Sequence, residues 1–129
     1  MYDYRVGIMK VVDGDTVHAV WDFGGETYRL VTLRLEGINA PEMSTPEGHT
    51  SRDALTQQII DHGLSSLDVS TSVGEAFSDK VLWLNMRTHK DKREKYGRYL
   101  ATLYSQDWQT NINEWMVENN FAVPYEGEN

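Results

Sequence analysis

Three short blocks of this sequence combine acidic, basic and aromatic side chains at spacings that could do chemistry. They are Asp13-Gly14-Asp15, the pair Arg34 and Glu42 eight residues apart, and Lys95-Tyr96-Gly97-Arg98. Carboxylate oxygens can ligate a hard cation or accept a proton, and a planar guanidinium can donate two hydrogen bonds to a phosphate. Each block also has a plainer interpretation, as a turn, a solvated loop acid or one more surface cation. The elements that position the blocks therefore matter as much as the residues.

Charge is distributed unevenly along the chain. The formal net charge of −8 disfavours a protein that binds polyanions over its whole surface. Residues 80–98, however, hold seven of the twelve Lys and Arg residues against two acids, which gives +5 there and −13 elsewhere. This basic segment is either a solvated loop or an approach path for a polyanion on an acidic body.

The bulk composition fits one ordinary folded domain spanning residues 1–129, with 40% hydrophobic and 25% charged residues. The absence of cysteine excludes disulfides and thiolate metal sites and is compatible with a reducing compartment. The N-terminal residues alternate apolar and polar side chains without a long apolar run, so we expect neither a signal peptide nor a membrane span. A cytoplasmic monomer is the resulting expectation. The four histidines show no ligand spacing, so a zinc site is not expected.

Period-two alternation and β-branched or aromatic residues predict strands in the first part of the chain and again near its end. The predicted strands are residues 4–12, 16–23, 27–36, 81–88 and 99–104, with a further short extended piece at 67–73. Helical spacing predicts helices at residues 51–62 and 111–119, and a charged loop is expected between the last two strands. Five strands with a helix after the third match a mainly β, α+β fold, the five-stranded Greek-key barrel called the OB-fold, with two helices.

Taken together and in this order, three blocks resemble the staphylococcal nuclease (thermonuclease) family. They are residues 12–17 (VDGDTV), 34–42 (RLEGINAPE) and 95–101 (KYGRYLA). The resemblance extends from about residue 5 to residue 125, and the polar stretch 70–80 lacks an obvious counterpart. Short chains of this kind also resemble some phage-encoded members, which would place the protein in the host cytoplasm.

The resemblance implies a role for each matching residue. Asp15, the residue at position 39 and the backbone carbonyl of Ala40 would hold a Ca²⁺ ion, and Glu42 would be the general base that activates water. Arg34 and Arg98 would grip the scissile phosphate as its oxygens gain charge. Lys95 and Tyr96, and more loosely Tyr125, would contact the bound nucleotide.

Position 39 departs from the family pattern, which has Asp where this chain has Asn39. An amide oxygen can ligate Ca²⁺ without contributing negative charge, so weaker metal binding is the expected consequence. The alternative is that Asn39 caps a turn and that no metal binds.

The resemblance implies a Ca²⁺-dependent nuclease that hydrolyses DNA and RNA with low sequence specificity, prefers single strands and leaves 3′-phosphate ends. A different class remains open, because the same fold also serves as a non-catalytic module that binds nucleic acid or protein. Arg34, Glu42 and Arg98 favour the enzyme, whereas Asn39 and the acidic body favour the binding module. A structural domain within a larger complex is a third possibility.

Overall fold

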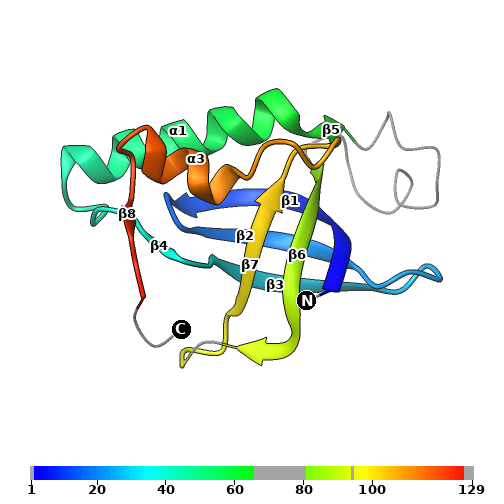
Figure 1. Cartoon of the computed structure of the whole chain (residues 1–129). Coiled ribbons are helices and arrows are strands. Elements are labelled where there is room, and N and C mark those ends of the chain that lie inside the picture. Colours follow the sequence, from blue (N-terminus) through cyan, green and yellow to red (C-terminus); the bar gives the residue numbers. More distant parts are fainter. Residues whose placement is uncertain (1, 66–80, 94, 127–129) are drawn as a thin grey trace.

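Five strands close into a barrel in the computed structural model, which describes residues 2–65, 81–93 and 95–126 (Figure 1). They are β1 (Tyr2–Asp13), β2 (Thr16–Asp22), β3 (Tyr28–Leu35), β6 (Leu82–Arg93) and β7 (Tyr99–Tyr104). The strand order is β1-β2-β3-β7-β6, and β1 also pairs with β6, so the sheet closes on itself. The β3–β7 pairing is parallel and the others are antiparallel. This topology confirms the predicted OB-type barrel.

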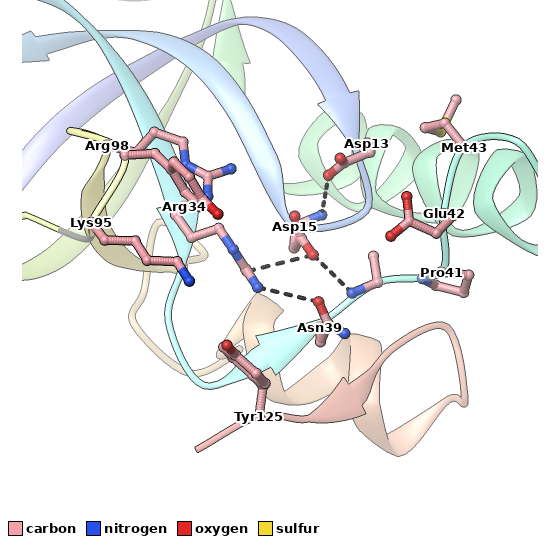
Figure 2. Close-up of a pocket in the computed structure, with 12 residues that line it drawn as sticks. Asp13, Asp15, Arg34, Asn39, Pro41, Glu42, Met43, Lys95, Arg98 and Tyr125 are labelled. Atoms are coloured by element: carbon pink, nitrogen blue, oxygen red, sulfur yellow. Dashed lines mark hydrogen bonds and ion pairs between the residues drawn. The ribbon is translucent and has the colours of Figure 1, made fainter. Parts of the chain in front are cut away.

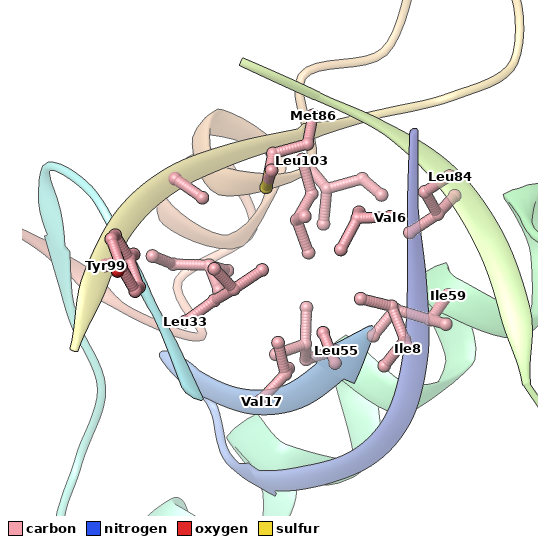
Figure 3. Packing of buried hydrophobic residues seen from close by; sticks show 14 of the residues in the cluster. Val6, Ile8, Val17, Leu33, Leu55, Ile59, Leu84, Met86, Tyr99 and Leu103 are labelled. Atoms are coloured by element: carbon pink, nitrogen blue, oxygen red, sulfur yellow. The ribbon is translucent and has the colours of Figure 1, made fainter. Parts of the chain in front are cut away.

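The barrel interior is filled by the inward-facing residues that the alternation predicted. Val17, Leu33, Leu84 and Leu103 come from four different strands and are fully buried, and Figure 3 shows them converging on one core. Each such side chain contributes roughly 1.5–3 kcal/mol when removed from water. The barrel is therefore a packed scaffold that can hold surface residues in fixed positions.

Two helices cover one end of the barrel, as Figure 1 shows. Helix α1 (Pro46–His62) inserts Leu55 and Ile59 into the core, and the shorter α3 (Ile112–Glu118) packs nearby. The prediction that the first helix starts at residue 51 was wrong, because Thr45 caps it earlier. Its hydroxyl accepts a hydrogen bond from the Gly48 amide at 3.1 Å, and proline follows at the first helical position.

Three two-residue strands complete the described structure. β4 (Ile38–Asn39) pairs with β8 (Val123–Pro124), and β5 (Leu64–Ser65) pairs with the start of β6. The β4–β8 pairing brings the C-terminal tail beside the segment that carries Asn39.

The charged loop that was predicted between the last two strands is shorter in the structure. β6 continues to Arg93, beyond the predicted end at residue 88, so much of the basic segment is the end of a long strand. The extended piece predicted at 67–73 lies outside the described residues. Among the described helices, none is long and apolar enough to cross a membrane.

Candidate active site

All nine predicted site residues line one pocket of about 380 Å³, shown in Figure 2. The pocket lies where the β1–β2 turn, the end of β3, the segment after β4, the β6–β7 loop and the tail after β8 meet. It also includes three residues for which sequence reasoning assigned no role: Asp13, Pro41 and Met43. Asp15 and Tyr125, which are 110 positions apart in the sequence, thus line the same pocket.

The β1–β2 turn reaches the pocket because its central residue is glycine. A Cβ on Gly14 would lie 1.9 Å from the Ser51 hydroxyl oxygen and 2.8 Å from the Ala40 Cβ. The missing side chain lets the turn pack directly against helix α1 and the segment after β4. Within the turn, Asp13 Oδ1 accepts a hydrogen bond from the Asp15 amide at 2.9 Å.

The Asp15 carboxylate is buried and links three parts of the site. Its Oδ2 accepts a hydrogen bond from the Ala40 amide at 2.8 Å, and its Oδ1 accepts one from the Thr16 hydroxyl at 2.9 Å. Arg34 Nη1 lies 3.5 Å from the same Oδ2. These contacts tie the β1–β2 turn to β3 and to the segment after β4, so Asp15 is more than a turn residue.

Arg34 is a buried arginine on the outer face of β3, with 5% of its surface exposed. Its Nη1 donates to the Leu35 carbonyl at 2.9 Å, and its Nη2 lies 3.4 Å from Asn39 Oδ1. The Tyr125 ring covers the guanidinium, with 5.7 Å from Cζ to the ring centroid. Tyr125 is held there by its amide, which donates to the Gly37 carbonyl at 2.8 Å. The plain interpretation of Arg34 as a solvent-facing strand residue is therefore excluded.

Glu42 enters the pocket from the loop between β4 and α1. Its carbonyl accepts hydrogen bonds from the amide and the hydroxyl of Thr45, at 3.0 and 2.7 Å. A Cβ on Gly48 would lie 2.0 Å from that carbonyl oxygen, so a glycine in the first turn of α1 is needed for this close approach. The Glu42 side chain is exposed and its carboxylate has no hydrogen-bond partner within the described part of the chain. Figure 2 shows the carboxylate pointing toward the β1–β2 turn.

The opposite wall is cationic and aromatic. Lys95 Nζ and Arg98 Cζ lie 5.2 and 5.4 Å from the centroid of the Tyr96 ring, which is 72% exposed. Arg98 Nη1 also lies 3.5 Å from the Thr16 hydroxyl. Two guanidinium groups thus border the same pocket, one from β3 and one from the loop before β7.

Asp13, in the β1–β2 turn, has a carboxyl group whose pKa is raised in the folded protein. Burial raises its pKa to about 6, and the neighbouring Asp15 carboxylate adds to the rise, while Arg34 opposes it. The folded protein thus disfavours the charged form of Asp13, chiefly because the carboxylate is partly buried. The signal in the sequence was the first aspartate of the Asp-Gly-Asp block, which sequence reasoning treated only as part of a turn.

The oxygen donors in the pocket fit a hard cation chemically. They are the carboxylates of Asp13, Asp15 and Glu42 and the amide oxygen of Asn39, and oxygen ligands are those that Ca²⁺ takes. In the described residues, no group of three acidic or histidine side chains is arranged as a ready-made metal site. Asn39 contributes an oxygen but no charge, as the sequence indicated.

Comparison with known proteins supports this site. The chain is 28% identical over 118 residues to an uncharacterized endonuclease of Haemophilus influenzae, covering 92% of this chain and 51% of that protein. It is 25% identical over 131 residues to an uncharacterized protein of Methanocaldococcus jannaschii, covering 95% of this chain and 59% of that protein. The chain thus spans between half and three fifths of the length of these relatives. A family model described as staphylococcal nuclease homologue matches residues 32–129, which include eight of the nine predicted site residues. On that match, over about three quarters of its length, the chain belongs to the staphylococcal nuclease homologue family.

Proposed function

We propose that this pocket hydrolyses phosphodiester bonds of DNA and RNA, with Ca²⁺ as cofactor and a preference for single strands. One observation carries the proposal: two arginines and an unpaired carboxylate, brought from distant parts of the chain, border the same pocket beside a buried aspartate. Family membership and the endonuclease relative support a nuclease-type activity. The full activity and its substrates remain part of the proposal, because the chain matches only part of each relative.

The side chains have complementary tasks in this mechanism. Arg34 and Arg98 bind the non-bridging oxygens of the scissile phosphate, and their guanidinium groups stabilise the negative charge that grows as the pentavalent transition state forms. Glu42 accepts the proton of the attacking water, a task that suits an exposed carboxylate without a competing partner. As the water oxygen bonds to phosphorus, the P–O bond on the opposite side breaks, and the leaving alkoxide takes a proton from solvent. Positioned base catalysis of this kind typically contributes ~10²–10⁴-fold.

Asp15, the Asn39 amide oxygen and the Ala40 carbonyl would hold the cation, with Asp13 beside them. A bound Ca²⁺ would polarise the phosphate and offset its developing charge. The pocket's own residues support such an ion in one further way. Burial, and to a smaller extent the neighbouring Asp15, raise the pKa of Asp13, and a cation at the turn would favour its ionised form.

Cleavage of single-stranded DNA by the wild type and by Glu42→Gln tests the proposal, with Ca²⁺ titrated from a chelated baseline. Glu47→Gln is the matched control, because Glu47 is an acid in the first turn of α1 outside the pocket. We expect Ca²⁺-dependent cutting by the wild type and the control, and a loss of at least a hundredfold in Glu42→Gln. Parallel reactions with RNA and with duplex DNA measure the substrate preference.

A non-catalytic binding module is the second candidate, and Asn39 is the observation that favours it. The position is uncharged, and the described residues hold no ready-made three-acid metal cluster. Binding of labelled single strands without shortening at any Ca²⁺ concentration would favour this candidate. Restoring Asp at position 39 would then be the first variant to assay.

A further inference from the structure

A second groove opens directly beside the active-site pocket, along the edge of β3 that faces the loop before β7. It has a volume of about 330 Å³ and shares Tyr96 and Arg98 with the pocket. Side chains on a strand alternate between faces, and Leu33 and Leu35 point into the core. Leu30, Thr32 and Arg34 therefore form one outward column, which leads from the buried arginine of the pocket into this groove.

The groove combines an apolar surface with positive charge. Leu30 is 68% exposed, and the exposed Tyr96 ring lines the same groove. Arg29 lines it as well, and its Nη1 donates to the Tyr99 hydroxyl at 3.2 Å. Gly97, in the loop that lines the groove, has a φ of 85°, and no atom of the described residues lies within 4 Å of where its Cβ would be.

Charge distinguishes this groove from two other surface grooves of the described structure. It is lined by two arginines and no acid. The groove near the N-terminus includes Asp3 and Asp22, and the one beside α3 includes three glutamates. On a body whose remainder carries −13, a polyanion would find a favourable path from the pocket into the β3 groove.

We propose that this β3 groove is a subsite for one nucleotide of the substrate strand, next to the scissile phosphate. The base lies against Leu30 and Tyr96, and the phosphate of that nucleotide lies near Arg29. An apolar surface accepts the face of any base, so the subsite would add affinity without sequence specificity. A base held flat against the barrel must be unpaired, which gives the single-strand preference a physical cause. This inference rests on the proposed function.

Cleavage of a dinucleotide and of trinucleotides extended on the 5′ or the 3′ side tests the subsite. We expect extension on one side to raise kcat/KM. Leu30→Ala should lower kcat/KM for the extended substrate by up to roughly tenfold, near the lower end of what an aromatic side chain contributes to one stacked base. Leu30→Phe should retain the gain, because it keeps an apolar face. Ile60→Ala is the matched control, since Ile60 is an exposed aliphatic residue on α1, outside the groove.

The contribution of Arg29 is tested by salt dependence. Neutralising one phosphate of a single strand changes the slope of log affinity against log salt by about 0.7. Arg29→Gln should reduce the slope by that amount for the extended trinucleotide, whereas Arg52→Gln, on α1, should not. Binding is measured by fluorescence anisotropy in the Glu42→Gln background, so that cleavage does not interfere.

The outcomes separate the two proposals. Binding without cutting by the wild type would refute the proposed hydrolysis, and the anisotropy series would still test the groove. Equal binding of dinucleotide and extended strands, or Leu30 and Arg29 variants that match their controls, would overturn the subsite while leaving the hydrolysis intact.

Discussion

Replacing Asp13 by Asn should stabilise the metal-free protein at alkaline pH and have no effect in acid. The folded protein raises the pKa of Asp13 from 3.8 to about 6, chiefly by burial and with help from Asp15. Above pH 6 the side chain is charged in both folded and unfolded states, and the folded state carries the full electrostatic penalty. Below the unfolded value of 3.8 the side chain is neutral in both states and the penalty vanishes. The contribution of Asp13 to the free energy of unfolding therefore falls as the pH rises from about 4 to about 6.

The magnitude follows from the size of the shift. Two pKa units correspond to about 3 kcal/mol, but Asp13 is only half-buried, so solvent screening reduces the expected effect to about 1 kcal/mol. Asn keeps an acceptor for the Asp15 amide, so the turn itself should survive the change.

Urea denaturation at pH 4 and pH 8, in the presence of a chelator, measures the difference. Asp13→Asn should unfold at higher urea than the wild type at pH 8 and at nearly the same urea at pH 4, where the penalty is only beginning to develop. Asp53→Asn, at an aspartate on α1 whose side chain is 70% exposed, is the control for replacing a surface carboxylate by an amide. Equal shifts of the urea midpoint at both pH values, or destabilisation at pH 8, would show that the ionised Asp13 side chain does not destabilise the folded protein.

Three further changes test other parts of the site. Asn39→Asp should tighten Ca²⁺ binding and lower the Ca²⁺ midpoint for cleavage, because it adds a negative charge to the ligand set; calorimetry giving unchanged affinity would count against Asn39 as a ligand. Gly14→Ala should cost about 1–3 kcal/mol of stability in urea and reduce cleavage, since its Cβ would overlap the Ser51 hydroxyl; a fully stable variant would refute that close approach. Thr45→Ala should cost about 1 kcal/mol by removing the cap of α1, whereas Thr45→Ser should retain most of it.

The sequence was sufficient to predict the barrel and nine of the twelve residues that line the pocket. Strand alternation predicted the five barrel strands, the three blocks predicted eight of those nine residues, and the tail supplied the ninth, Tyr125. The functional roles of those residues stay predictions. What local patterns missed were features set by distant contacts. Asp13 matters because burial and Asp15 raise its pKa, and neither effect is visible in a turn motif.

The wrong element boundaries have two causes. The start of α1 is set by a local signal, the Thr45 cap followed by Pro46, which lies outside the apolar periodicity that predicted the helix. β6 runs on to Arg93 because its backbone still pairs with Tyr99, although its sequence there is almost entirely charged. Pairing with a neighbouring strand overrode the local composition.

The parallel pairing of β3 with β7 has a consequence for the order in which the protein is made. Leu33 lies opposite Tyr99, and this pairing sets Arg34 and Arg98 into the same pocket from opposite halves of the chain. A nascent chain that ends before residue 95 holds Asp15, Arg34 and Glu42 without their cationic wall. Under the proposed function, hydrolysis would therefore begin only after residues 95–104 have been made and β7 has paired with β3.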